Sequence, residues 1–370
     1  MTVTFSTIAT ASGHVFGRAT LDAPASLNAL TLEMIDLLAS QLARWAADPA
    51  VAGVVLDAAG DRAFCAGGDV VALHRAIRDT ERGDVPTLAT AFFEREYRLD
   101  HRLHTFPKPV LCWGHGIVMG GGIGLLAGAS HRVVTARTKL AMPEITIGLY
   151  PDVGGSWFLG RAPGRSGLFL ALTGAPLDAS DACFAGLADF QLPHAAHDAA
   201  LLAIAAARWS GTQAADAARL SHLLDALAQG VERPPSGLRA RLDRIDAVIG
   251  HDRLDDIAPR LLALADADDP WLANAAAAFA KGSPTSARLS FEMQRRAKHL
   301  SLADVFRLEY QASVGCCLQG DFAEGVRALL VDKDKTPRWQ PSRLADVDDS
   351  AIEALLAPRS AGAHPLADLR

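Results

Sequence analysis

Two carboxylates stand eight positions apart in an apolar segment, AMPEITIGLYPDVGGSWF, that runs from residue 141 to 158. Glu144 and Asp152 each follow a proline. A buried carboxylate is costly unless it is paired, hydrogen-bonded or protonated. In a chemical interpretation, one acid is a general base or nucleophile, and the other positions water or moves a proton. In a structural interpretation, Glu144 caps a turn and Asp152 caps a helix that begins near Gly154. The pattern leaves Glu144 open and favours the cap for Asp152.

Two glycine-rich loops, FCAGGD (64–69) and MGGGIGLLAG (119–128), are each predicted to join a strand to a helix. Glycine lets the backbone approach a ligand closely, and the amides of a helix N-terminus favour a negative oxygen. The two loops together could each give one N–H to a single carbonyl oxygen, which is an oxyanion hole. The first loop alone is more typical of a tight turn. The second fits the dinucleotide fingerprint GxGxxA, but too few residues precede the strand at His131 for a nucleotide-binding crossover.

Other polar residues carry weaker signals. Glu94 and Glu96 lie on a predicted helix, where charges usually face solvent, although apolar neighbours leave room for one acid to point inward. His115 stands in a buried strand, and such a histidine is more often a satisfied core residue than a base. The charged run at 332–335 is typical of a solvated surface, and its spacing does not indicate a role for its lysines at a phosphate.

The elements that would position these residues alternate between strands and helices over residues 1–195, which predicts an α/β fold with parallel pairing. From residue 196 to 345 the chain is rich in Ala and Leu and is predicted to be helical. Residues 346–370 are predicted to be an irregular, exposed tail. Within the first region, we predict a hairpin of 3–9 with 14–21, helices at 31–49 and 88–104, and strands at 51–58, 109–119 and 131–136.

Composition excludes several classes of protein. The 370 residues are 50% hydrophobic and 21% charged, which is ordinary for a globular protein, and the net charge of −6 argues against a general nucleic-acid binder. The five cysteines form no CxxC motif, which favours reduced thiols in a cytoplasmic protein. Neither a secretory signal nor an apolar run long enough to span a membrane is recognised. No cluster of metal-ligating residues stands out, so we expect no metal.

The ordered set FCAGGD, GHGIVMGGGIGLLAG and AMPEITIGLYPDVGG resembles the crotonase (enoyl-CoA hydratase/isomerase) superfamily over about residues 1–190. The resemblance implies a spiral of ββα turns and an acyl-CoA substrate, with coenzyme A as part of that substrate and no separate cofactor. It also implies homo-oligomers and an oxyanion hole made by the amides of Gly68 and Gly121. By the same resemblance, the adenine of coenzyme A would lie along the loop formed by Ala66, Gly67, Gly68 and Asp69.

One branch of the superfamily resembles the chain further. Hydratases carry a second glutamate where this chain has Gly124, and usually a glycine where it has Asp152. FFEREY, SPTSARLS and DFAEGVRALLVDKDKTPRW are similar to 3-hydroxyisobutyryl-CoA hydrolases, which act in valine breakdown, and extend the resemblance to about residue 340. This resemblance implies that Glu144 and Asp152 carry catalysis, and that Glu96 and Gly121 contact the substrate together with both acids.

One expectation concerns Asp152, and two alternatives to hydrolysis stay open. The helix after Asp152 should help to keep that aspartate ionised. The nearest alternative within the superfamily is an enoyl-CoA isomerase that uses Glu144 as its sole base, whereas Asp152 together with Gly124 weighs against an enoyl-CoA hydratase. The alternative outside enzymes is a CoA-binding paralogue without activity, because function resides in the site rather than in the fold.

Overall fold

The computed structural model describes residues 2–81, 83–359 and 362–370. The chain forms two compact units, and each is built from three separate stretches of sequence. The first unit comprises the residues up to Gly68, then Arg98–Leu140 and Leu177–Ala240. The second comprises Asp69–Tyr97, Ala141–Pro176 and the residues from Arg241 onward.

A six-stranded sheet organises the first unit, in the order β1-β2-β3-β5-β7-β9. The predicted hairpin is confirmed, because β1 and β2 pair antiparallel from Val3 opposite Leu21 to Ala9 opposite Val15. The other strands pair in parallel, as the alternating pattern predicts. The strands are β1 (Val3–Ala9), β2 (Val15–Leu21), β3 (Val51–Ala58), β5 (Val110–Gly114), β7 (His131–Val134) and β9 (Phe190–Gln191).

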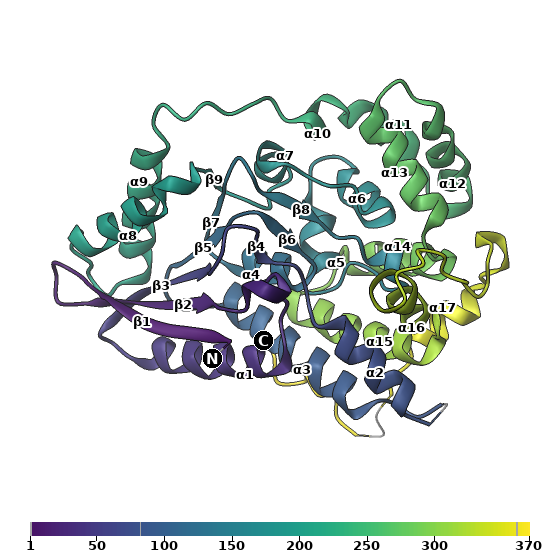
Figure 1. Cartoon of the computed structure of the whole chain (residues 1–370), viewed down its shortest axis with the longest axis horizontal. Coiled ribbons are helices and arrows are strands. Elements are labelled where there is room, and N and C mark those ends of the chain that lie inside the picture. The colour runs from purple at the N-terminus through teal and green to yellow at the C-terminus, as the bar shows by residue number, and fades with distance from the viewer. Residues whose placement is uncertain (1, 82, 360–361) are drawn as a thin grey trace. The chain divides into compact units, whose positions relative to one another are not determined.

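Helices cover both faces of this sheet (Figure 1). Successive residues of a strand point to opposite faces. Phe16 therefore packs against Trp209, with ring centroids 4.4 Å apart, on the face covered by α8 (His197–Ala206) and α9 (Gln213–Ala228). Its neighbour Gly17 leaves room on the other face for Trp45 of α1 (Leu32–Ala47). The predicted cap of α1 is confirmed, since the Thr31 side chain accepts from the amide of Met34.

The continuous strand predicted for 109–119 is wrong. The chain leaves the large sheet after β5, turns at Gly116 with φ +60°, and enters β6 (Ile117–Met119) of a second sheet. A Cβ at Gly116 would lie 2.3 Å from the carbonyl oxygen of Arg62, so only glycine permits this turn. His115 beside it is buried, with Nε2 2.6 Å from the Gly60 carbonyl, which fits the predicted core role. The second sheet contains β4 (Ala63–Cys65), β6 and β8 (Lys139–Ala141).

The second unit is mainly helical, and within the described residues no strand follows β9, so the predicted helical C-terminal region is confirmed. None of the helices in the described ranges is long and apolar enough to cross a membrane. The first unit also holds α4 (Gly121–Gly128), α7 (Ala179–Phe184) and α10 (Gly237–Ala240), while α3 (Thr87–His104) runs from the second unit into the first. The other helices of the second unit are α2 (Val70–Asp79), α5 (Gly155–Phe158), α6 (Ser166–Thr173), α11 (Leu242–Ile249), α12 (Leu254–Leu262), α13 (Pro270–Lys281), α14 (Pro284–Ala297), α15 (Leu302–Gln319), α16 (Asp321–Val326) and α17 (Asp349–Leu356).

The irregular tail predicted for 346–370 is wrong at α17. The Asp348 side chain accepts from the amide of Ala351 and caps this helix. Ile352, Leu355 and Leu356 are buried, and they recur at the spacing of one helix face. The cap and the apolar spacing were both present in the sequence, so this helix could have been predicted.

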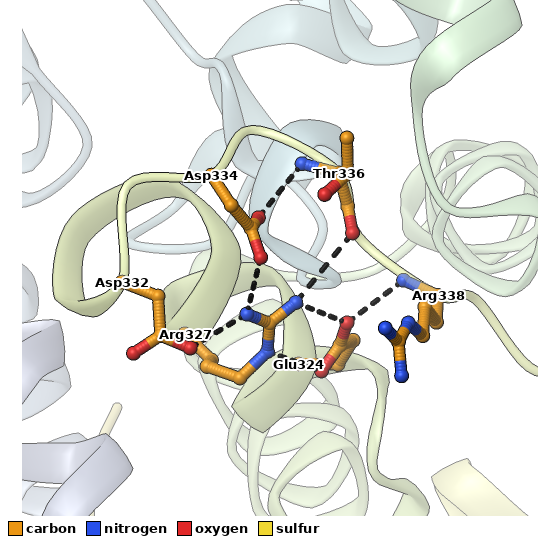
Figure 2. A network of polar contacts seen from close by, with 6 residues as sticks. All are labelled: Glu324, Arg327, Asp332, Asp334, Thr336 and Arg338. Atoms are coloured by element: carbon orange, nitrogen blue, oxygen red, sulfur yellow. Dashed lines mark hydrogen bonds and ion pairs between the residues drawn. The ribbon is translucent and has the colours of Figure 1, made fainter.

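A cluster of ion pairs surrounds Arg327 on the surface of the second unit (Figure 2). The guanidinium donates to both carboxylate oxygens of Glu324 at 2.8 Å, and to Asp332 and Asp334 at 2.7 Å. Lys333, between Asp332 and Asp334, and Lys335, directly after Asp334, have φ of +59° and +57°, in the left-handed region that L residues rarely adopt. The Arg327 cluster therefore holds a strained stretch of backbone in one conformation.

Candidate active site

The two glycine loops lie against each other in the first unit. A Cβ on Gly67, at φ +112°, would lie 3.4 Å from the carbonyl oxygen of Met119. A Cβ on Gly122 would lie only 2.3 Å from the carbonyl oxygen of Cys65, so a side chain there would force the loops apart. Close packing of one loop on the other therefore explains the glycine at 122, and Gly120 adopts a positive φ of +48°.

Both predicted oxyanion amides are available as donors. Gly121 is the first residue of α4, where the backbone N–H has no acceptor within the helix. Across the described ranges, neither the Gly68 amide nor the Gly121 amide has a hydrogen-bond acceptor. Asp69, from the loop expected to follow coenzyme A, uses its carboxylate to cap α2 by accepting from Ala72 N at 3.0 Å. The arrangement suits stabilisation of a negative oxygen, and the oxyanion hole itself stays a prediction.

Three acids singled out from the sequence come together in the second unit. Glu96 lies on α3, Glu144 begins the 3₁₀ helix η2 (Glu144–Ile147), and Asp152 lies in the turn before α5. Their exposed fractions are 2%, 5% and 5%. None of the three makes an ion pair with any residue that the structure describes. The cluster is therefore a group of buried acids without a compensating cation.

Burial and mutual repulsion set the protonation of these acids. Burial raises the pKa of Glu144 well above its usual value, and the charges of Asp152 and Glu96 raise it further. The pKa of Glu96 is likewise raised by burial and by Asp152. Burial also raises the pKa of Asp152, but only to about 6, because the Tyr97 hydroxyl donates to its Oδ2 at 2.6 Å. Asp152 is consequently the acid of the three whose charged form is supported by a side-chain donor.

Two buried carboxyl oxygens, Glu96 Oε1 and Glu144 Oε2, have no hydrogen-bond partner within the described part of the chain. Native proteins satisfy most buried polar atoms, so an orphaned carboxyl oxygen needs an explanation. A substrate that supplies a hydroxyl or a water molecule would satisfy both atoms. The orphaned oxygens therefore mark the polar groups that a ligand of this cluster would meet.

The cap predicted for Asp152 is wrong. The helix α5 has Gly154 at its N-cap position and receives no side-chain cap from Asp152. The carboxylate of Glu309 on α15 takes that role, accepting from Gly154 N at 2.7 Å and Ser156 N at 2.9 Å. The amides at this helix start therefore serve Glu309, and the expectation that they keep Asp152 ionised is also wrong. The donor to Asp152 is the Tyr97 hydroxyl.

Sequence reasoning missed Tyr97 and Glu309. Tyr97 was seen only as an apolar neighbour of Glu96 and is fully buried, while Glu309 is 0% exposed in α15. The available signal was an acid at a core position of an apolar helix, since Val305, Phe306 and Tyr310 around Glu309 are also buried. The sequence gives no indication of which amides such an acid binds.

The chain belongs to the enoyl-CoA hydratase/isomerase family, because the model of that family matches residues 16–356. A relative from Gallus gallus, named "3-hydroxyisobutyryl-CoA hydrolase, mitochondrial", is 38% identical over 92% of this chain and 86% of its own length. A relative from Arabidopsis thaliana, named "3-hydroxyisobutyryl-CoA hydrolase 1", is 37% identical over 90% of this chain and 87% of its own. The human relative with the same name as the chicken protein is 34% identical over 91% and 84%.

Two solved structures share the fold over nearly the whole chain. A carnitinyl-CoA dehydratase from Mycobacterium thermoresistibile has a TM-score of 0.85 and 38% identity, and covers 97% of both chains. An enoyl-CoA hydratase from Rhodobacter sphaeroides has a TM-score of 0.81 and 36% identity, and covers 97% of this chain and 98% of its own. The predicted crotonase-like fold, with its parallel sheet and helical C-terminal region, is confirmed.

Proposed function

We propose that this chain hydrolyses a short hydroxyacyl-CoA thioester, 3-hydroxyisobutyryl-CoA, to 3-hydroxyisobutyrate and free coenzyme A. The proposal rests on the relatives of that name at 34–38% identity over about nine tenths of the chain. The structural observation that supports it is the place of Asp152. This acid faces Glu96 and Glu144 in a buried cluster instead of capping a helix, so the chain has the second carboxylate that hydrolysis can use.

The protonation of the cluster suggests how hydrolysis proceeds. Near neutral pH Asp152 carries a negative charge, because its pKa is about 6, and this charge together with burial disfavours ionisation of Glu96 and Glu144. If water attacks the thioester carbonyl, its proton moves to Asp152. If Glu144 attacks and forms an anhydride, it must first give its own proton to Asp152. In both routes Asp152 accepts the proton and passes it to the departing thiolate of coenzyme A, which leaves as the thiol. In the anhydride route a water molecule then cleaves the anhydride, which releases 3-hydroxyisobutyrate and restores the Glu144 carboxyl.

The other site residues are assigned complementary roles. Hydrolysis of a thioester passes through a negatively charged oxygen, and the free amides of Gly68 and Gly121 are suited to stabilise it. Loss of one such donor costs about 3 kcal/mol in the transition state of other enzymes. A protonated Glu96 would hold the 3-hydroxyl of the substrate. Within the described residues no group of His, Cys, Asp and Glu side chains could hold a metal ion, and the proposed route uses none.

The reaction class is tested by a panel of acyl-CoA esters assayed for release of the thiol. We expect the fastest release from 3-hydroxyisobutyryl-CoA, slower release from other short hydroxyacyl esters, and none from long-chain esters. Binding of acyl-CoA without release of thiol from any ester would refute hydrolysis and favour a CoA-binding protein without activity.

A second candidate is hydration or isomerisation of an enoyl-CoA, because both solved structures above carry names of that kind. Incubation with crotonyl-CoA and with a 3-enoyl-CoA distinguishes the two candidates. Hydration or double-bond migration without release of thiol from 3-hydroxyisobutyryl-CoA would establish this alternative.

A further inference from the structure

We propose that Tyr97 is a positioning residue whose hydroxyl, held in place by Ser313, makes Asp152 the acid of the buried cluster that carries the negative charge. The proposal rests on the proposed hydrolysis for its catalytic meaning. The charge assignment within the cluster can be tested without catalysis.

The hydroxyl of Tyr97 is fixed by contacts on both sides. It donates to Asp152 Oδ2 at 2.6 Å and lies 2.6 Å from Ser313 Oγ. A hydroxyl has one proton, so a tyrosine that donates to Asp152 must accept from Ser313. The Tyr97 ring is fully buried between Phe93 and Phe306, with both centroids 5.8 Å away. The oxygen therefore cannot swing away from Asp152 without repacking of the core.

A second tyrosine, Tyr150, lies beside Ser313 as well. Tyr150 Oη lies 2.9 Å from Ser313 Oγ and donates to the main-chain carbonyl of Glu309 at 2.7 Å. Tyr150 gives its single proton to that carbonyl and Ser313 gives its own to Tyr97, so Tyr150 and Ser313 are neighbours without a shared proton. Within the described residues Tyr150 makes no hydrogen bond to Asp152. The two tyrosines thus both lie beside Ser313, but Tyr97 donates to Asp152 and Tyr150 donates to the Glu309 carbonyl.

Among the described residues no other side chain favours the charge of Asp152, and the main-chain amide of Asp152 itself makes a smaller contribution than the Tyr97 hydroxyl. The titratable groups that interact with it come from α3, η2, its own turn and α15, and all are acidic or neutral. Burial opposes ionisation of every one of them, and each negative charge opposes the others. The side-chain contact that lowers the pKa of Asp152 is the Tyr97 hydroxyl. The titratable groups that interact with Asp152 are Glu96, Tyr97, Glu144, Tyr150, Glu309 and Cys316.

The hydroxyl of Tyr97 itself keeps its proton near neutral pH. Burial and the adjacent Asp152 charge raise the pKa of its hydroxyl well above the usual value. It can therefore donate to Asp152 at every pH at which the enzyme is folded. A permanent donor favours the charged form of Asp152, and the charge of Asp152 in turn disfavours ionisation of Glu144.

The test compares Tyr97→Phe with Tyr150→Phe. The second variant also removes a buried hydroxyl beside Ser313, but it leaves the hydrogen bond to Asp152 in place. The measurement is the pH profile of kcat/KM for thiol release. Loss of a hydrogen bond to a charged group should move the acidic limb of Tyr97→Phe upward by about one to two pH units. The limb of Tyr150→Phe should stay at the wild-type position, and Tyr97→Phe should recover activity above its new midpoint.

A uniform loss of activity at all pH values, or an unshifted limb in Tyr97→Phe, would overturn the proposal and leave Tyr97 a structural residue. If Tyr97→Phe does not fold, Ser313→Ala replaces it, with a smaller upward shift expected and an unshifted limb as the contrary result. An infrared titration of the carboxyl band, as wild type minus Asp152→Asn, gives the same midpoint without substrate. The infrared titration tests the charge assignment even if no thioester is hydrolysed.

Discussion

Two groups of carboxylates in the second unit behave in opposite ways. Around Arg327, the guanidinium lowers the pKa of Glu324 and holds that of Asp334 at about 2. Around Asp152, burial without a cation raises the pKa of Glu96 and Glu144 well above the usual range. The residue types are the same, and the difference is the presence of a cation and of water. A carboxylate beside a guanidinium serves structure, whereas one that is buried without a cation is poised to move protons.

The same difference decides what each group gives to the protein. The Arg327 cluster fixes a strained surface segment with two left-handed lysines. The buried cluster gains little from folding, because ionisation of any of its acids is opposed by burial. Sites of this kind are retained for function at a cost in stability. Four substitutions test this difference between the two clusters, from the largest expected effect to the smallest.

Glu144→Gln and Asp152→Asn should each lower kcat for thiol release by about 100-fold or more, because general acid–base groups contribute on that scale. The matched controls are Glu324→Gln and Asp334→Asn from the Arg327 cluster, which should keep turnover close to that of the wild type. If both cluster variants retain normal turnover, the acids of the buried cluster are not catalytic.

Asp152→Asn should make the protein more stable at pH 8, although it inactivates the enzyme. The folded-state pKa of Asp152 is about 6, above its unfolded value near 4, so the wild type loses stability as pH rises between these values. The asparagine variant avoids this loss, which amounts to roughly 2–3 kcal/mol above pH 6.

Urea unfolding at pH 4 and pH 8 measures this difference. For the opposite sign, Asp334→Asn should be less stable than the wild type at pH 8 and approach it as pH falls toward 2, because the pKa of Asp334 is lowered. A variant Asp152→Asn that is equally destabilised at both pH values would contradict the assignment of a raised pKa.

Glu309→Gln should destabilise the protein by about 1–3 kcal/mol. The amides of Gly154 and Ser156 donate to the two carboxylate oxygens of Glu309, and in the variant one of these amides would face the NH2 group of the glutamine. Burial raises the pKa of Glu309 to about 8, so the measurement is urea unfolding at pH 9, where this carboxyl is ionised. Glu324→Gln also loses one hydrogen bond, from Arg327. The loss of stability should be smaller in this variant, because the ion pair of Glu324 and Arg327 is solvated. Equal losses in the two variants would show that Glu309 is not a buried cap.

Arg327→Ala should have the smallest effect on global stability and a local effect on the segment from 332 to 338. Without its guanidinium, the lysines at left-handed φ lose the contacts that hold the backbone. Trypsin should cleave faster at Lys333 and Lys335 in the variant than in the wild type. Arg343→Ala, which removes an exposed ion pair with Asp346, is the control and should leave cleavage in this segment unchanged.

Much of the fold follows from local pattern. The hairpin, the cap of α1 and the strand β3 were predicted because alternation, a capping threonine and a short apolar run act over a few residues. The predicted strand 109–119 failed at Gly116, where the turn depends on the carbonyl of Arg62 far away in the sequence. Local pattern cannot report a contact that is made only when distant segments pack.

The sequence by itself determined which residues could carry chemistry: two acids in an apolar segment and two glycine-rich loops. Only the tertiary structure decided what Asp152 does. The helix start beside Asp152 is capped by Glu309, which lies 155 positions from Gly154 along the chain. Asp152 is thereby left to the Tyr97 hydroxyl and to its repulsion from Glu144. A carboxylate takes its protonation from the donors and charges around it, and those neighbours come together only through folding.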